Sequence, residues 1–212
     1  FFVSEENLQG DTIWIDGDDV NHIRHVLRMN PGERVMVSCG KGVDYECEIT
    51  GFEQARVLLA IRKETPAVTE LPVEITLFQA LPKKDKMELV IQKAVELGAS
   101  HIVPVKTRRC VVKLDDKKEE KKLARWRTIA EAAAKQSGRG LIPQVHSVQS
   151  WEEALITAER LDMAVIPYEL CEDMASSVEI MRKAADQRSL GIFIGPEGGF
   201  ERGEVDAAIR KG

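Results

Sequence analysis

The chain has 212 residues, a net charge of −5 and 43% hydrophobic residues, which is typical of one large or two modest globular domains. No apolar run reaches 18 residues, so the sequence predicts no membrane span. The start "FFVSEENLQG" lacks the basic and apolar segments of a secretion signal, which favours a cytoplasmic protein. Four cysteines without a Cys-x-x-Cys pair indicate reduced, mostly buried thiols: Cys39, Cys47, Cys110 and Cys171.

The charge is unevenly distributed along the chain. Residues 82–145 carry 16 Lys and Arg against 8 Asp and Glu, whereas residues 1–72 and 146–212 each carry 7 against 13. A basic island on an acidic protein is typical of a nucleic-acid contact. The alternative is a set of solvated lysines on helix surfaces.

The first seventy residues predict a small antiparallel sheet or barrel. Short β-rich segments alternate apolar and polar residues and are separated by the turn signals "NPGE" and "GKG". A helix is expected at residues 18–30, and it carries Arg24 and Arg28 one turn apart, as candidates for contact with an RNA backbone. The stretch "KETPAVTELP" at 63–72 predicts a linker. The β-rich segments are 12–15, 33–39, 45–50 and 55–61.

From Val73 onward, apolar strands alternate with amphipathic helices. This pattern predicts a mostly parallel sheet that is covered on both faces. Gly98 follows the first helix at the position where a left-handed cap is easiest for glycine. The expected strands are 73–81, 101–105, 163–167 and 190–194, and the clearest helices are 86–98 and 119–138.

The strand at 190–194 leads into a loop with the sequence Gly195, Pro196, Glu197, Gly198 and Gly199. Ligands of parallel sheets bind beyond the carboxyl ends of the strands, and glycines there permit positive φ and close approach of a flat ligand. The spacing is neither that of a dinucleotide motif nor that of a P-loop, and an acid in the loop would repel phosphate. A ligand with hydrogen-bond donors and positive charge, such as an adenosyl sulfonium, fits better. The alternative is a tight strand-to-helix turn without a ligand.

Basic residues follow the strands at 73–81 and 101–105. Because these strand ends are expected at the same sheet edge as the glycine loop, their side chains are candidates for holding RNA phosphates. Each of them alone is more often a solvated side chain. They are Lys83, Lys84, Lys86, Arg108 and Arg109.

The segment "IGPEGGFERGEVD" closely resembles the signature of the RsmE family, the 16S rRNA uracil-N3 methyltransferases of the SPOUT superfamily. The segments "HIRHVLRMNPGE", "KKDKMELVIQKAVELGAS" and "RWRTIAEAAAKQSGR", with "IPQV" after the last, are similar to the same family in the same order. The resemblance implies a PUA-like β-barrel domain for RNA recognition at 1–70. It also implies a SPOUT α/β domain with a mostly parallel sheet and a C-terminal trefoil knot at 73–212. S-adenosylmethionine as methyl donor, a homodimer, and 16S rRNA within the 30S subunit as partner follow from the same resemblance.

The resemblance also suggests site residues. Arg139, in "KQSGR", is the first candidate for contact with the target base or its phosphate, with Gln136 beside it; the alternative for Arg139 is a cation that interacts with a helix dipole. Pro167 and Glu169, after the strand at 163–167, are expected to join the glycine loop Gly195–Gly199 in the cofactor pocket. The general base is not indicated, and Glu197 fits that role and a role in orienting the cofactor equally well.

Family members continue into a segment with an LGxRILRxETA-like pattern that completes the knot and one wall of the cofactor pocket. This sequence stops at Gly212. Either it is given without its tail, or it is a truncation that is expected to bind the cofactor poorly.

Three other functions stay open. A SPOUT enzyme could act on another RNA or on ribose 2′-OH, a non-catalytic factor could bind RNA or assist ribosome assembly, and a small-molecule α/β enzyme would leave the basic island unexplained. His22 and His25 lack a further ligand at a known spacing, so no metal site is expected. The three tryptophans sit in apolar patterns and are expected in the core: Trp14, Trp126 and Trp151.

Overall fold

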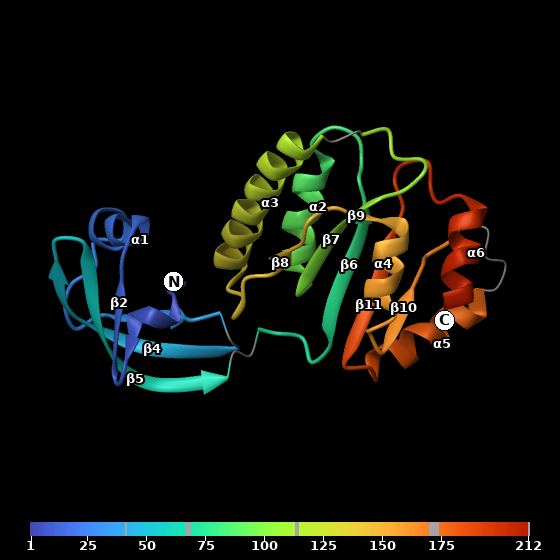
Figure 1. Ribbon diagram of the computed structural model, residues 1–212. Helices are drawn as coiled ribbons and strands as arrows, with labels where there is room; N and C mark the ends of the chain where they lie inside the picture. Colours follow the sequence, from blue (N-terminus) through green and yellow to red (C-terminus); the bar gives the residue numbers. More distant parts are fainter. Residues whose placement is uncertain (41, 67–68, 113–114, 170–173, 212) are drawn as a thin grey trace. The chain divides into compact units, whose positions relative to one another are not determined.

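The computed structural model describes residues 1–40, 42–66, 69–112, 115–169 and 174–211. The chain forms two compact units, one of Phe1–Glu70 with Ala134–Ile142 and one of Leu71–Ala133 with Pro143–Gly212. Figure 1 labels most of their helices and strands. The sequence predicts one domain at 1–70 and a second at 73–212, and it does not anticipate that residues 134–142 belong to the first unit.

The first unit is built on a five-stranded antiparallel sheet with the order β1-β2-β5-β4-β3. Alternate apolar residues of its strands, such as Ile13 and Ile15 in β2, are buried on one face, which is why this sequence forms strands. The amide of Val3 donates to the carbonyl of Ser38 at 3.0 Å, so the N-terminal segment that leads into β1 also pairs with β3 and curls the sheet toward closure. The elements are η1 (Glu5–Asn7), β1 (Leu8–Gln9), β2 (Thr12–Ile15), α1 (Asp18–Asn21), η2 (His22–Val26), β3 (Arg34–Ser38), β4 (Val43–Glu53) and β5 (Arg56–Pro66).

Two sequence expectations in this unit are wrong. The helix expected at 18–30 ends at Val26 as the π-helix η2, and Arg28 lies beyond it with φ of 55°, so Arg24 and Arg28 do not share a helical face. The linker expected at 63–72 begins later, because β5 pairs with β4 as far as Pro66. Residues 67–68 of that linker lie outside the described residues.

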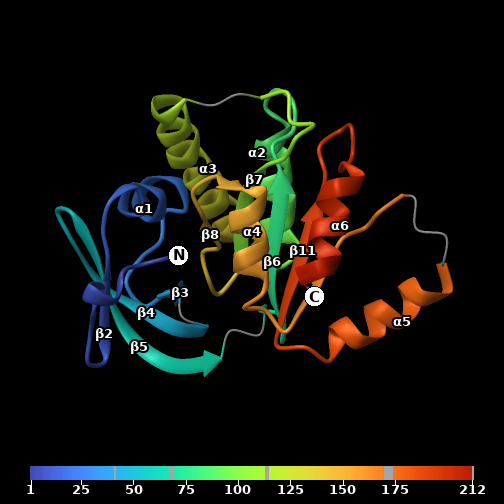
Figure 2. The same cartoon turned by 45° about the vertical axis from the view of Figure 1, so that its right-hand side comes forward.

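The second unit is built on a parallel sheet with the order β10-β11-β6-β7-β8, in which β9 also pairs with β7. Figures 1 and 2 show α4 and α6 on one face of this sheet and α2 on the other. Phe78, Val103 and Phe193 from the central strands pack under α4 and α6. Because α2 lies on the opposite face, the sheet is covered on both faces, as the sequence predicts. The elements are β6 (Glu74–Ala80), α2 (Lys86–Glu96), β7 (His101–Lys106), α3 (Asp116–Ser137), β8 (Gln144–Val145), β9 (Gln149–Ser150), α4 (Trp151–Ala158), β10 (Met163–Val165), α5 (Met174–Ala185), β11 (Ser189–Ile194) and α6 (Arg202–Lys211).

Several details of the core agree with the sequence. Gly98 has φ of 104°, as expected for a left-handed cap. Trp126 and Trp151 are buried, as expected. Trp14 is only half-buried, with the guanidinium of Arg56 at 4.9 Å from its ring, which corrects its expected place in the core. The trefoil knot, which concerns how the chain threads, stays a prediction.

Among the described residues, no helix combines the length and apolar character that crossing a membrane requires. The described cysteines are free thiols, and burial raises the pKa of the Cys47 thiol to about 11. Cys39 and Cys110 are only half-buried, which corrects the expectation of mostly buried thiols. Cys171 lies outside the described residues.

Candidate functional site

Three neighbouring parallel strands, β11, β6 and β7, end at the same edge of the second unit's sheet. The loops that follow them carry the glycines, the lysines and the two arginines that the sequence singles out. Contacts between these loops, given below, confirm that they meet at one edge. The carboxyl edge of a parallel sheet is the usual place for a ligand.

The glycine loop is a tight turn in which the amide of Gly199 donates to the carbonyl of Pro196 at 2.8 Å. Gly199 has φ of 68°, which a larger residue adopts only with strain. A Cβ on Gly195 would lie 3.3 Å from the main chain of Gly199. Among the described residues, a Cβ on Gly198 would meet only the side chain of Arg109, at 3.6 Å. Gly195 and Gly199 therefore serve the turn itself, whereas Gly198 leaves main chain exposed.

The carboxylate of Glu197 turns toward the loop after β6. It accepts the backbone amide of Lys83 at 3.2 Å and the Nζ of Lys86 at 2.8 Å. The hydrogen bond from Lys86, supported by backbone amides, lowers the pKa of Glu197 to about 2. Because an effective general base has a pKa near the working pH, Glu197 is poorly suited to accept a proton, which weakens one of its two expected roles.

The loop after β7 is tied to the glycine loop and to α6. Arg109 donates from Nη1 to the carbonyl of Gly198 at 2.6 Å, and the amide of Arg108 donates to Oε1 of Glu204 at 2.9 Å. The other carboxylate oxygen of Glu204 accepts the amide of Glu201 at 2.9 Å, as in half of a capping box at the start of α6. Glu204 is buried, and the sequence reasoning missed it, although its place three residues after Glu201 is the signal that could have found it.

The loop after β10 also reaches the glycine loop. Oε1 of Glu169 lies 3.5 Å from the position that a Cβ on Gly199 would take. Among the described residues, none donates a hydrogen bond to this exposed carboxylate. Pro167 is exposed, and Tyr168 between them packs against the core. An exposed carboxylate beside open glycine main chain can accept hydrogen bonds from a ligand that carries donors.

The residues predicted to contact the base, Arg139 and Gln136, belong to the first unit. Arg139 forms an ion pair with Glu70, with Nε to Oε1 at 3.0 Å, and the two side chains are 3% and 15% exposed. The amide of Gly140 donates to the same carboxylate at 2.7 Å. Gln136 is exposed. Their catalytic roles stay predictions, and a base contact by Arg139 would require its release from Glu70 or a shared interaction.

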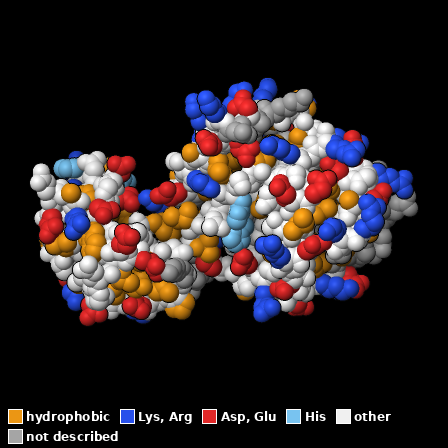
Figure 3. All heavy atoms as spheres, in the orientation of Figure 1, with side chains coloured by type: hydrophobic (Ala, Val, Ile, Leu, Met, Phe, Trp, Pro, Cys, Tyr) orange, Lys and Arg blue, Asp and Glu red, His pale blue; other side chains and the backbone are white. Residues whose placement is uncertain are grey.

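The remaining predicted RNA-binding residues differ in their contacts with the rest of the protein. Arg24 lies over the ring of Phe52 at 5.0 Å and donates to the carbonyl of Glu53, whereas Arg28 and Lys84 are exposed. Figure 3 shows Lys and Arg side chains gathered around the start of α3, where Lys117, Lys118 and Lys121 are exposed.

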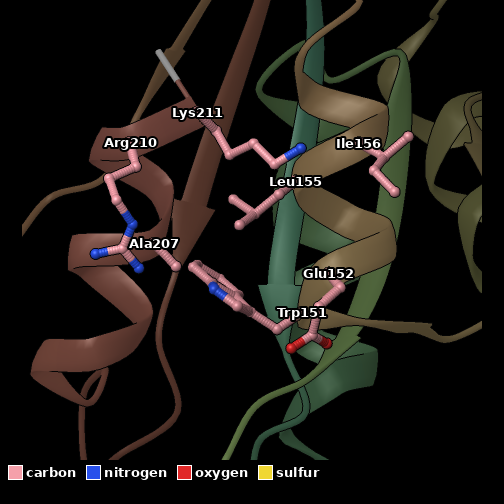
Figure 4. Close-up of a pocket in the computed structure, with 7 residues that line it drawn as sticks. All are labelled: Trp151, Glu152, Leu155, Ile156, Ala207, Arg210 and Lys211. Carbon is pink, nitrogen blue, oxygen red and sulfur yellow. The ribbon is translucent and has the colours of Figure 1, made fainter.

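A groove of about 440 Å³ lies elsewhere in the second unit, between α4 and α6. Figure 4 shows Trp151 and Leu155 of α4 facing Ala207 and Arg210 of α6 across it. The indole Nε1 of Trp151 is buried without an acceptor among the described residues. The groove includes none of the residues predicted to bind the cofactor or RNA, so it is not the predicted site.

A family model described as an RNA methyltransferase domain matches residues 69–212, and one described as an RNA methyltransferase PUA domain matches residues 15–59. The class of the protein is therefore that of RNA methyltransferases with a PUA domain. The Bacillus subtilis protein named ribosomal RNA small subunit methyltransferase E is 36% identical over 201 residues, which cover 93% of this chain and 78% of that protein. The chain belongs to the ribosomal RNA small subunit methyltransferase E family.

Two solved structures extend the similarity to the whole chain. A ribosomal RNA small subunit methyltransferase E from Neisseria gonorrhoeae, bound to S-adenosyl methionine, is 32% identical with a TM-score of 0.75, over 100% of this chain and 85% of that one. A putative methyltransferase from Legionella pneumophila in complex with its cofactor SAM is 27% identical with a TM-score of 0.80, over 100% and 85%. The predicted family and the predicted fold class, a mostly parallel α/β domain after a PUA-like barrel, are confirmed.

Proposed function

We propose that the protein transfers a methyl group from S-adenosylmethionine to N3 of a uridine in 16S rRNA. The observation that carries the proposal is the sheet edge at which the glycine loop Gly195–Gly199 meets the carboxylate of Glu169, in a chain of the methyltransferase E family. The related proteins from Bacillus subtilis and Neisseria gonorrhoeae are named for the small-subunit ribosomal RNA that they methylate.

The residues at this edge suit S-adenosylmethionine. Gly198 exposes main chain to a flat ring, and the carboxylate of Glu169 offers two acceptors to amino or hydroxyl groups. The cofactor when bound supplies an activated methyl group and carries positive charge at sulfur. A nearby carboxylate attracts such a cation, whereas a phosphate-bearing cofactor would be repelled.

Methylation at N3 requires that the imide proton of uracil leave and that the negative charge on O2, N3 and O4 be stabilised. Cationic donors near the base would stabilise that charge, and correct positioning would supply much of the remaining rate enhancement. Arg139 with Gln136 is proposed to contact the target nucleotide. Lys83, Lys84 and Arg108 are proposed to hold phosphates at the sheet edge, where they are exposed.

Further features of the proposal come from the family resemblance. The enzyme would act in the cytoplasm as a homodimer on RNA assembled into the 30S subunit, and its C-terminal region would form a trefoil knot. Arg24 and Arg28 of the first unit, and the lysines at the start of α3, would add backbone contacts of the kind that give salt-dependent RNA affinity.

Calorimetric titration of S-adenosylmethionine and S-adenosylhomocysteine into the full-length protein tests the proposal. We expect binding, and we expect Gly198→Val to weaken it, since a side chain there fills open space without straining the turn. Ala207→Val, on α6 and outside the edge, is the control. Binding of RNA without binding of either cofactor would reject the methyltransferase and favour a non-catalytic RNA-binding factor.

A further inference from the structure

We propose that Glu204 and Arg109 are positioning residues of the cofactor site, because together they hold the Thr107–Cys110 turn against the glycine loop. The inference rests on the proposed function and assigns to this turn a part in binding the cofactor. It gives Arg109 a role different from the phosphate contact that its place after β7 suggests.

Glu204 joins two segments that are far apart in the sequence. The residue is 3% exposed, and each carboxylate oxygen accepts a backbone amide at 2.9 Å, one from Arg108 after β7 and one from Glu201 before α6. A buried carboxylate is retained only where such donors compensate for lost hydration. Because both donors are main-chain groups, the side chain fixes the path of the backbone in both segments.

The turn that Glu204 holds has a regular structure of its own. The amide of Cys110 donates to the carbonyl of Thr107 at 3.1 Å, and their side-chain Sγ and Oγ1 atoms lie 3.2 Å apart. Arg109 occupies the middle of this turn and points its guanidinium at the glycine loop. Because the turn is fixed, the guanidinium of Arg109 is held beside the glycine loop.

The Gly198 carbonyl accepts Nη1 of Arg109 at 2.6 Å. The peptide plane between Gly198 and Gly199 is held from both ends, because the amide of Gly199 donates to Pro196 at 2.8 Å. Arg108 adds an ion pair with Glu201, Nη1 to Oε2 at 3.5 Å, beside the same loop. The main chain that a flat ligand would lie on is thus oriented before any ligand binds, which lowers the entropic cost of binding.

The test compares cofactor affinity in the absence of RNA. Glu204→Gln keeps the size of the side chain but replaces one acceptor oxygen by an NH₂ group that faces a backbone amide. Arg109→Gln removes the guanidinium from an exposed position and leaves the fold intact. We expect each change to raise the Kd for S-adenosylmethionine about tenfold, the effect of one lost charge-assisted hydrogen bond. Asp206→Asn and Arg202→Gln, at exposed positions of α6, are the matched controls.

If Arg109 binds RNA phosphate instead, Arg109→Gln will leave the Kd for S-adenosylmethionine unchanged. It will then raise the KM for RNA and reduce the salt dependence of RNA binding. If Glu204 only stabilises the fold, Glu204→Gln will lower the melting temperature without changing the Kd of the folded protein for S-adenosylmethionine. Either result overturns the inference. Hydrogen exchange of the peptide 195–201 provides a readout without ligand, and we expect it to accelerate in both variants. If the unmodified protein binds no S-adenosylmethionine, the proposed function fails, while unchanged exchange in the variants would separately reject the positioning role.

Discussion

Replacing Arg139 by methionine is expected to lower the free energy of unfolding by about 3 kcal/mol, the lower end of the range for breaking a buried ion pair. The pair with Glu70 is 3% and 15% exposed, and the guanidinium supplies three contacts of 2.5 to 3.1 Å. Without it, Glu70 keeps the amide of Gly140 at 2.7 Å, which is why the lower end applies.

Urea unfolding followed by far-ultraviolet circular dichroism measures the loss. For an m-value of about 2 kcal/mol/M, the midpoint should fall by about 1.5 M. The double variant Arg139→Met with Glu70→Leu should recover only part of the loss, because no buried charge is left unpaired but the buried amide of Gly140 loses this acceptor. As a control, Lys93→Met breaks an exposed pair with Glu96 and should leave the urea midpoint nearly unchanged.

The same variant separates two roles for Arg139. If Arg139→Met unfolds at the wild-type urea concentration and yet abolishes methyl transfer, the reasoning from the buried pair is refuted and the guanidinium acts on the substrate. If stability falls as calculated, the pair is structural, and a catalytic role requires a separate loss of kcat in the folded variant.

Four further predictions follow from the structure. The carboxyl of Glu197 should titrate by NMR with a pKa of about 2, and Lys86→Met should raise that pKa. The pKa in the folded protein lies below the ordinary value of 4.5. The contact with Lys86 therefore stabilises the fold above pH 4.5, and this contribution is lost as the pH falls through about 2. Burial, with His101 and Arg127 nearby, lowers the pKa of His146, so stability should fall as the pH drops below 6.5, and a flat stability profile between pH 7 and 5 in the wild type and His146→Gln alike would contradict this. Cys47, with a pKa of about 11, should resist iodoacetamide at pH 8 in the folded protein and react on unfolding; equal rates in both states would show that its thiol is accessible. Gly98→Ala should lower the free energy of unfolding by about 1 to 3 kcal/mol, because its φ is 104° and a Cβ would lie 2.5 Å from Cδ1 of Leu71; an unchanged melting temperature would disprove the strain.

The shared edge of the site could be predicted from the sequence because it depends on strand direction alone. Because β6, β7 and β11 are parallel neighbours, the residues that follow them lie at one edge of the sheet. Lys83 and Arg109 accordingly both contact the glycine loop, through Glu197 and Gly198. The left-handed φ of Gly199 was equally predictable, since few residues other than glycine tolerate it.

The partners of the charged residues could not be predicted in this way. Glu197 finds Lys86, and Arg139 finds Glu70, across 111 and 69 residues of chain, and no local pattern encodes such pairings. The end of the first helix was missed for a related reason: the π-helical turn at His22–Val26 shifts the following residues out of the 3.6-residue period that the prediction used. Glu204 was overlooked because an acid in a first helical turn is ordinary, and only burial distinguishes it.

The most direct test of the central claim is nucleoside mass spectrometry after reaction with methyl-deuterated S-adenosylmethionine. Full-length protein would be incubated with small ribosomal subunits that lack the modification, and the 16S rRNA would be digested to nucleosides. The account predicts the deuterated methyl group in 3-methyluridine. Label in a 2′-O-methyl nucleoside or in another base, or no label with a protein that binds the subunit, would contradict it.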